Sequence, residues 1–180
     1  MPFGGWDGYR ADMPKKGAIE TTATQQLIDN EVPYAVHQYG SDDEPAQIPT
    51  VTSSRRRAIE MGIDPTRVLH TELAIADGEP VITAVPASAV LDSASLAAAV
   101  GSVDSSPADS ADIRKVTGYK EEDLSVLGLR KHVPTVIDAA ALDFPTVVVS
   151  AGRYGYVVEL SPEDLVRLTN ARTAPIGRVL

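Results

Sequence analysis

The sequence predicts an α+β fold, in which helices surround one curved, mixed β-sheet. Short runs of β-branched residues, which are typical of strands, recur along the chain and are separated by turn signals. The predicted helices are scattered among hairpins, and this pattern argues against regular alternation around a parallel sheet. The length of 180 residues fits a single domain with one core.

The N-terminal third predicts two helices and one strand. Residues 1–18 lack periodicity, so we expect a flexible arm over residues 1–20. A helix is predicted over residues 22–31, where apolar side chains share one face, and a strand over residues 34–39. The acidic, proline-containing stretch 40–53 predicts a mobile loop. A helix over residues 55–61 follows, with a glycine directly after it as the stop signal.

The middle of the chain predicts a hairpin and two further helices. Asp77-Gly78 is a strong turn signal between two apolar runs, 68–75 and 81–85. A helix over residues 92–100 is capped by its first residue, an aspartate, and stopped by a glycine. A shorter helix is predicted over residues 110–116.

The C-terminal third predicts three strands and a helix. The strands are β-branched runs over residues 134–138, 144–150 and 156–160. The turn over residues 151–155 contains two glycines that can adopt positive φ. Ser161 is a helix N-cap candidate, because proline follows it at the first helical position and two acidic residues come next.

Composition limits the classes of function. The chain has no cysteine, which excludes disulfides, thiol catalysis and cysteine-ligated metals. No apolar run approaches the length of a membrane span, so we expect a soluble cytoplasmic protein without membrane partners. The net charge of −9 predicts weak binding to nucleic acid, since cationic side chains supply most of that affinity. A local basic patch or a partner protein would have to offset this repulsion.

Several short motifs recur in a fixed order along the chain. They are Thr21-Thr22-Ala23, Leu27-Ile28, Val32-Pro33-Tyr34, His37 with Tyr39, Ala58 to Gly62, Asp64-Pro65-Thr66-Arg67-Val68, Leu91-Asp92, Thr117-Gly118-Tyr119 and the segment 115–170. In this order they resemble the YbaK/ProX family of aminoacyl-tRNA editing proteins, whose fold also occurs as the editing insertion of bacterial prolyl-tRNA synthetases. The resemblance implies a barrel-like sheet and an editing domain over residues 21–170, with 171–180 as a C-terminal tail.

The resemblance implies hydrolysis of the ester that links a wrongly attached amino acid to the 3′ end of tRNA. In the family, a lysine in a Phe-Lys-Thr motif supplies a cation at this site. Here His70 occupies that position, before Thr71. A histidine with a pKa near ~6.5 is mostly neutral at physiological pH, so the cation becomes conditional, although His70 could act as a general base. A structural role for His70 in an apolar strand is equally open.

Two further positions depart from the family pattern. Members carry Gly-Gly-Ile-Ser-Pro-Leu-Gly, where this chain has residues 122–128 with Glu122 and Asp123 in place of the paired glycines. Ser125 and Gly128 match the pattern. The two carboxylates add bulk and would repel tRNA phosphates, which predicts an altered substrate, a closed pocket, or a solvated acidic loop without a role.

The second departure is electrostatic, because a basic stretch of the family falls on uncharged and acidic residues around Asp104. The remaining candidates for contact with phosphates are Arg55, Arg56, Arg57, Arg130 and Lys131. Three arginines in the first turn of the helix predicted over residues 55–61 would oppose its dipole, and an anionic partner would relieve this repulsion. A solvated basic face is the alternative interpretation.

The resemblance also implies which residues line or support the amino-acid site. They are His37, Tyr39, Thr71, Ser125, Gly128, Ser150, Gly152 and Arg153. Turn geometry alone is a sufficient reason for the glycine at position 152. The three histidines of the chain lack metal-ligand spacing, so we expect neither a metal nor another cofactor.

Two main functions remain open from the sequence. The first is a deacylase that acts in trans on mischarged tRNA, with cysteinyl- or alanyl-tRNA(Pro) as the first candidate substrates. The second is a catalytically impaired binding module for an amino acid, an aminoacyl-tRNA or an aminoacyl-tRNA synthetase. The substitutions at His70, Glu122 and Asp123 motivate this alternative. A purely structural interaction protein is a third possibility, and DNA is not an expected partner.

Overall fold

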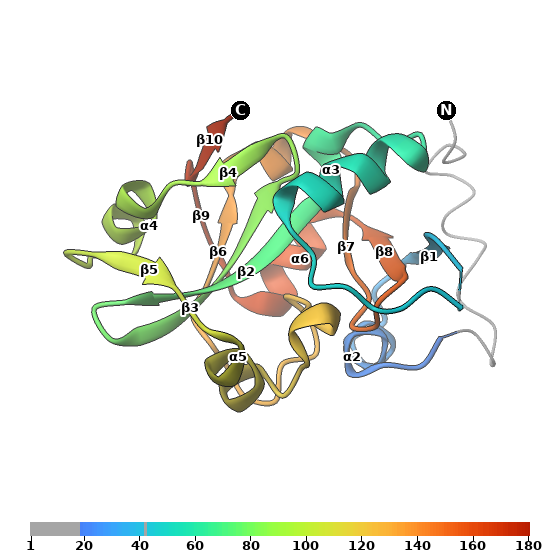
Figure 1. Cartoon of the computed structure of the whole chain (residues 1–180), viewed down its shortest axis with the longest axis horizontal. Coiled ribbons are helices and arrows are strands. Elements are labelled where there is room, and N and C mark those ends of the chain that lie inside the picture. The colour runs from blue at the N-terminus through green and yellow to red at the C-terminus, as the bar shows by residue number, and fades with distance from the viewer. Residues whose placement is uncertain (1–18, 42) are drawn as a thin grey trace.

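The computed structural model describes residues 19–41 and 43–180, and Figure 1 shows their arrangement. The arm expected over residues 1–20 lies almost entirely outside the described residues. The helices are α2 (Thr22–Asp29), α3 (Val51–Glu60), α4 (Ser93–Val100), α5 (Ser110–Thr117) and α6 (Pro162–Thr169), with short 3₁₀ turns η1 (Pro65–Arg67), η2 (Glu121–Asp123) and η3 (Ala139–Asp143). No helix in this part of the chain is both long and apolar enough to span a membrane.

In the described part of the chain, ten strands are distributed over three sheets. They are β1 (Ala35–Gln38), β2 (Leu69–Ala76), β3 (Glu79–Pro86), β4 (Ala89–Leu91), β5 (Ser105–Pro107), β6 (Thr135–Asp138), β7 (Val147–Ser150), β8 (Tyr156–Leu160), β9 (Arg172–Ala174) and β10 (Gly177–Val179). The largest sheet has the order β5-β2-β3-β6-β9, a second has the order β1-β8-β7, and β10 pairs with β4. The two larger sheets are linked by a parallel bridge between Val68 and Val148 but do not close into a barrel, so the expected barrel-like character is a minor feature.

The five-stranded sheet is mixed, as the sequence predicts. Strands β2 and β3 form an antiparallel hairpin, whereas β6 runs parallel to β3 and β9 parallel to β6. The hairpin turn is at Asp77 and Gly78, which have φ values of 48° and 85°. Both central residues of this turn therefore have the positive φ that a type I′ turn requires.

The main apolar core lies where the large sheet, the three-stranded sheet and helices α2 and α6 meet. Leu27, Ile82, Ile137, Leu160 and Leu165 are fully buried in this core. Burial of one such side chain stabilises the fold by about 1.5–3 kcal/mol relative to leaving it exposed. The core joins elements from both ends of the chain, as expected for one domain.

Helix α3 begins earlier than the sequence predicted. The expected loop over residues 40–53 ends at Thr50, where a capping box starts the helix. The Thr50 hydroxyl accepts a hydrogen bond from the backbone N–H of Ser53 at 3.1 Å. The Ser53 hydroxyl in turn accepts one from the backbone N–H of Thr50 at 2.9 Å. This exchange satisfies N–H groups that the first turn of a helix leaves unpaired.

Residues 171–180, expected as a C-terminal tail, contain two strands that complete two sheets. Strand β9 adds to β6, and β10 pairs with β4. The carboxylate of Asp138 accepts hydrogen bonds from the backbone of Ile176 at 3.1 Å and of Gly177 at 2.7 Å. Strand β7 begins three residues later than predicted, and Pro145, which lacks a backbone N–H, lies in the excluded part.

Candidate active site

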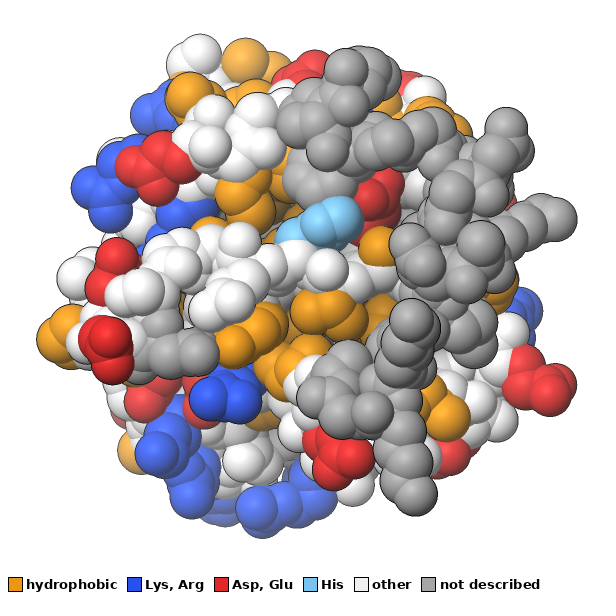
Figure 2. Space-filling view, turned by 90° about the vertical axis from the view of Figure 1, so that its right-hand side faces the viewer, with side chains coloured by type: hydrophobic (Ala, Val, Ile, Leu, Met, Phe, Trp, Pro, Cys, Tyr) orange, Lys and Arg blue, Asp and Glu red, His pale blue; other side chains and the backbone are white. Residues whose placement is uncertain are grey.

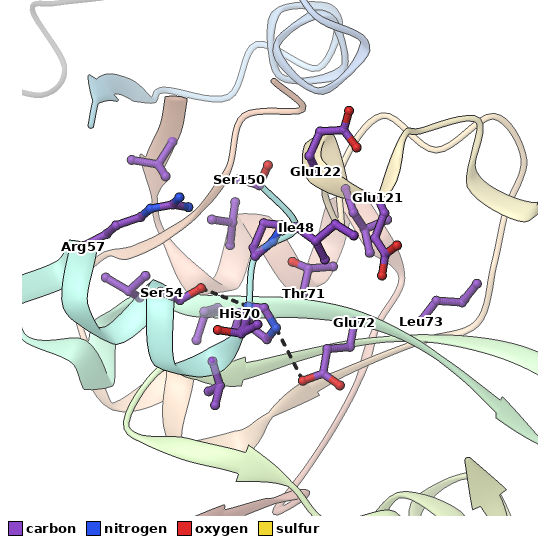
Figure 3. Close-up of a pocket in the computed structure, with 18 of the residues that line it drawn as sticks. Ile48, Ser54, Arg57, His70, Thr71, Glu72, Leu73, Glu121, Glu122 and Ser150 are labelled. Atoms are coloured by element: carbon purple, nitrogen blue, oxygen red, sulfur yellow. Dashed lines mark hydrogen bonds and ion pairs between the residues drawn. The ribbon is translucent and has the colours of Figure 1, made fainter. Parts of the chain in front are cut away.

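A cavity of about 400 Å³ opens between helix α3, the edge of β2, the end of β7 and the segment around η2. Strand β2 has an open edge here, because it pairs with β5 only over residues 74–76 and the bridge to β7 is made by Val68, the residue before β2. His70, Thr71 and Glu72 lie on this open stretch and line the cavity (Figure 3). The volume lies in the range of small-ligand sites.

The His70 side chain is buried in the cavity wall, with 8% of its surface exposed. Its Nδ1 lies 3.0 Å from the Ser54 hydroxyl, and its Nε2 lies 3.5 Å from the Glu72 carboxylate. Burial lowers the pKa of His70 to about 4, so the imidazole is neutral at physiological pH. His70 can therefore accept a proton but does not supply a fixed positive charge.

Burial also affects the pKa of Glu72 and the hydrogen bonding of Thr71, the two neighbours of His70 on β2. Burial raises the pKa of Glu72, whose side chain is one-third exposed. The Thr71 hydroxyl oxygen is buried and has no hydrogen-bond partner among the described residues. A buried hydroxyl without a partner costs free energy, and such a group can serve as a donor to a bound ligand.

Arg57 supplies the single Lys or Arg side chain among the described residues of the cavity wall. Its guanidinium lies 4.4 Å from the ring centre of Tyr39 and 4.8 Å from that of Tyr154, and it donates a 2.6 Å hydrogen bond to the Tyr154 hydroxyl. These cation–π contacts hold the charge at one side of the cavity.

A family model described as "Aminoacyl-tRNA editing domain" matches residues 49–168, a segment that includes helix α3, strand β2 and most of the cavity wall. This chain belongs to the aminoacyl-tRNA editing domain family. The editing domain is also 28% identical over 163 residues to the "Putative Cys-tRNA(Pro)/Cys-tRNA(Cys) deacylase EbsC" of Enterococcus faecalis, an alignment that covers 90% of this chain and 96% of that protein.

Solved structures share the fold of this editing domain. A "putative trans-editing enzyme for prolyl tRNA synthetase" superimposes with a TM-score of 0.73 at 16% identity, covering 89% of this chain and 99% of that one. The hypothetical protein APE2540 superimposes with a TM-score of 0.75 at 19% identity, covering 88% and 100%. At these identities the two structures establish the fold alone.

The structure brings five of the predicted site residues to the cavity of the editing domain: Tyr39, Arg57, His70, Thr71 and Ser150. Glu72 and Ser54, the two cavity residues that contact the imidazole of His70, were not among the candidate site residues. Glu72 is two positions from His70, so period-two alternation on a strand places both side chains on one face. Ser54 comes from a separate helix, and only the tertiary structure places it beside the imidazole.

Other predicted site residues support the walls without lining the cavity. Ser125 is fully buried, donates a 2.7 Å hydrogen bond to the carbonyl of Ser150 and accepts one from the Leu127 backbone. Gly128 has a φ of +69°, and a Cβ added there would lie 2.4 Å from the backbone nitrogen of Ala23. Close packing of two backbones is therefore the reason for this glycine.

The hairpin residues Gly152 and Arg153 also lie outside the cavity. Gly152 has a φ of +84°, and a Cβ added there would approach the Tyr119 hydroxyl to 2.9 Å. Arg153 is exposed, with its guanidinium 5.2 Å from the ring centre of Tyr156. Turn geometry and packing explain both positions in this structure.

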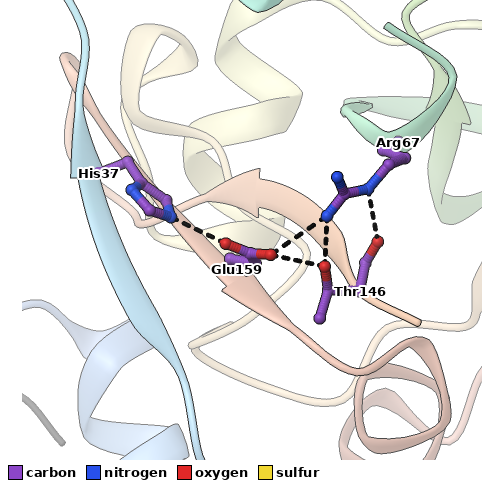
Figure 4. A network of polar contacts seen from close by, with 4 residues as sticks. All are labelled: His37, Arg67, Thr146 and Glu159. Carbon is purple, nitrogen blue, oxygen red and sulfur yellow. Dashed lines mark hydrogen bonds and ion pairs between the residues drawn. The ribbon is translucent and has the colours of Figure 1, made fainter. Parts of the chain in front are cut away.

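His37 belongs to a separate polar network (Figure 4). Its Nε2 lies 3.0 Å from the carboxylate of Glu159, which also accepts hydrogen bonds from Arg67 at 3.1 Å and from Thr146 at 2.5 Å. Burial alone would raise the pKa of Glu159, but these hydrogen bonds and the two basic partners outweigh it and lower that pKa. The network ties β1 and η1 to strand β8 and to Thr146, the residue before β7.

The acidic segment that replaces the glycine-rich pattern of the family leaves the cavity open. Glu121 and Glu122 line it, and Glu122 lies on the opposite side from His70 (Figure 3). Asp123 instead accepts a 2.8 Å hydrogen bond from the backbone of Tyr154. Of the outcomes expected from the sequence, a closed pocket is therefore wrong.

The basic residues are dispersed, and the expected opposition of three arginines to the helix dipole is wrong. Because α3 starts at Val51, Arg55 and Arg56 lie in its interior and Arg57 lies in its last turn, where the dipole favours a cation. Arg130 and Lys131 are exposed and line a second hollow, away from His70. On the face in Figure 2, Lys and Arg side chains gather along the margins with acidic ones between them.

Proposed function

We propose that this chain is a trans-acting aminoacyl-tRNA deacylase that removes a wrongly attached amino acid from tRNA, with cysteinyl- or alanyl-tRNA(Pro) as the first candidate substrates. The observation that carries the proposal is the open cavity of about 400 Å³ with a neutral imidazole in its wall, on the fold of the editing family. The name of the Enterococcus faecalis relative supports cysteinyl-tRNA(Pro) as one of these candidates.

The chemistry of the wall suits hydrolysis of an activated ester. His70 is in its basic form at neutral pH and can take a proton from an attacking hydroxyl group. Since no ammonium group occupies position 70, hydrogen-bond donors would have to stabilise the oxyanion, and the Thr71 hydroxyl is one such donor. Ile48, Met61 and Leu73 give the cavity apolar walls against which a small side chain can pack.

We propose further that a partner helps to deliver the tRNA, and that the protein acts in the cytoplasm, where mischarged tRNA is used. The net charge of −9 and the dispersed basic residues favour weak direct binding to RNA. An aminoacyl-tRNA synthetase is the partner class that holds this substrate at the moment of mischarging. A pull-down with purified prolyl-tRNA synthetase, with and without tRNA, tests the association.

The deacylase proposal is tested by incubating the purified protein with a panel of mischarged tRNAs that includes cysteinyl- and alanyl-tRNA(Pro). We expect release of the amino acid from at least one of them well above the spontaneous rate. His70→Ala should reduce the rate about 10²-fold or more, the usual contribution of a general base. His132→Ala is the matched control, because this exposed histidine lines the second hollow. Spontaneous rates across the whole panel would refute the proposal.

A binding module without turnover is the second candidate, and one observation favours it. The position that carries a lysine in the family holds a neutral His70, and Glu121 and Glu122 add negative charge to the cavity. This candidate predicts saturable binding of an aminoacyl-tRNA or a non-hydrolysable analogue with no release of amino acid. Turnover in the deacylation assay excludes it.

A further inference from the structure

Each ring nitrogen of His70 faces an oxygen of another cavity residue. The Ser54 hydroxyl lies 3.0 Å from Nδ1, and the Glu72 carboxylate lies 3.5 Å from Nε2 (Figure 3). All three residues line the cavity, Ser54 from helix α3 and the other two from strand β2. The contacts form a continuous path from hydroxyl to imidazole to carboxylate.

The chemistry of these groups assigns the protons along this path. Nε2 faces the Glu72 carboxylate, and an ionised carboxylate can only accept hydrogen bonds, so we assign the proton of the neutral imidazole to Nε2. Nδ1 is then the acceptor, and the Ser54 hydroxyl donates to it. No other nitrogen of His70 remains to take a proton from water. The hydroxyl of Ser54 is therefore the group that this imidazole can deprotonate.

We propose that Ser54 is the nucleophile of the deacylation reaction, with His70 as its general base and Glu72 as the positioning residue that orients the ring. The proposal rests on the proposed function and deepens it by naming a covalent route. A nucleophile within hydrogen-bond reach of a base that a third group orients is the arrangement expected for such catalysis. The 3.5 Å contact with Glu72 is long for a hydrogen bond, and contacts of this kind shorten as charge develops on the ring.

The reaction balances with water as the only co-reactant. The Ser54 oxygen bonds to the ester carbonyl carbon while its proton moves to Nδ1 of His70. The bond from that carbon to the ribose oxygen then breaks, and the ribose oxygen takes the proton from Nδ1. Water attacks the acyl ester on Ser54 in the second half, its proton passes to Nδ1, and the released serine oxygen recovers that proton.

The Thr71 hydroxyl is a candidate donor for the oxyanion of both steps. Thr71 lies next to His70 in sequence and is part of the same cavity wall (Figure 3), and its buried hydroxyl has no partner among the described residues. A buried donor without a partner is already desolvated, so a developing negative charge can use it at little cost in reorganisation. This arrangement gives the Ser54 route a group that stabilises the tetrahedral intermediate.

The neighbouring serine on helix α3 offers a matched control. The Ser53 hydroxyl accepts a 2.9 Å hydrogen bond from the backbone N–H of Thr50 as part of the helix cap. The Ser54 hydroxyl is instead hydrogen-bonded to Nδ1 of His70. Ser53→Ala therefore deletes the same group one residue away without removing the contact with the imidazole. Because the chain has no cysteine, Ser54→Cys introduces a unique thiol and gives a second, independent readout.

The first experiment treats the full chain with a biotin-linked fluorophosphonate, which modifies activated serines, and maps the adduct by mass spectrometry. We expect one adduct, on Ser54, that is absent in Ser54→Ala, at least tenfold slower in His70→Ala and unchanged in Ser53→Ala. The thiol of the Ser54→Cys protein should react with iodoacetamide at least tenfold faster than the same thiol after His70→Ala is added. Equal reactivity of residue 54 with either reagent, with and without His70→Ala, would overturn the proposed activation of Ser54 by His70.

The second experiment quenches the reaction with radiolabelled alanyl- and cysteinyl-tRNA(Pro) in acid and looks for label on the protein. We expect transient label on Ser54, loss of turnover in Ser54→Ala, and in Glu72→Gln a lower kcat with an unchanged KM. Turnover by wild type with full activity in Ser54→Ala would overturn the covalent route and leave the deacylase proposal intact. Phosphonylation of Ser54 without turnover on any tRNA would instead refute the deacylase proposal and with it the role of Ser54 in deacylation, while the activation of Ser54 by His70 would stand.

Discussion

Replacing Glu159 with glutamine should destabilise the protein far more than the same change at an exposed glutamate. The Glu159 side chain is 10% exposed and accepts hydrogen bonds from His37, Arg67 and Thr146. Glu159→Gln leaves the guanidinium of Arg67, itself 15% exposed, without its anionic partner. Breaking a buried ion pair in this way costs about 3–5 kcal/mol. Because glutamine still accepts one hydrogen bond, we expect a loss of about 2–4 kcal/mol in the free energy of unfolding.

Urea unfolding followed by circular dichroism measures this loss, with Glu60→Gln as the control. Glu60 pairs with Arg56 at 3.9 Å, and both side chains are 65% exposed, so its replacement should cost about 0–1 kcal/mol. The folded-state pKa of Glu159 lies below the ordinary value of 4.5. Its contribution is therefore fully present above pH 4.5 and is lost as the pH falls through the folded pKa. Equal losses in the two variants at pH 7 would refute this reasoning.

Three further predictions concern single residues of the core and the site. His70 should titrate near pH 4 in an NMR experiment on its ring protons, and a midpoint near 6.5 would contradict its burial. Because the unfolded state takes up this proton near pH 6.5, the free energy of unfolding should fall as the pH falls from 6.5 to 4. Gly128→Ala should cost about 3 kcal/mol or more in urea unfolding, because φ is positive and the added Cβ meets the Ala23 backbone, whereas Gly78→Ala, with positive φ and no atom within 4 Å, should cost about 1 kcal/mol. Ser125→Ala removes two buried hydrogen bonds and should cost about 1–3 kcal/mol by the same measurement, and a neutral result would show that Ser125 does not brace the wall.

The sequence predicts most of the fold because the signals that define it are local. The turn at Asp77-Gly78, the serine cap of α6 and the β-branched runs of β6 and β8 each lie within a few consecutive residues. The start of α3 was missed, since its capping box lies in a segment with two prolines and no apolar period. Strands β9 and β10 have three residues each, too few for an alternation pattern, and they form only because distant partners offer free edges.

The candidate site was predictable only in part, for a related reason. His70 and Thr71 follow from a motif within one strand. The contact between Ser54 and His70 joins helix α3 to strand β2, and no sequence period reports such a contact. His37 was placed at the amino-acid site by resemblance, whereas its side chain binds Glu159, which is 122 residues away. Residues that act through long-range packing thus remain outside the reach of local patterns.

The central claim is that a neutral histidine in an open cavity replaces the cation of the editing family and supports hydrolysis. The most direct measurement is the rate at which wild type, His70→Ala and His132→Ala release the amino acid from cysteinyl- and alanyl-tRNA(Pro) at pH 7. We predict turnover by wild type and His132→Ala, and a loss of about 10²-fold in His70→Ala. Equal rates in all three proteins, or spontaneous rates throughout, would contradict the claim.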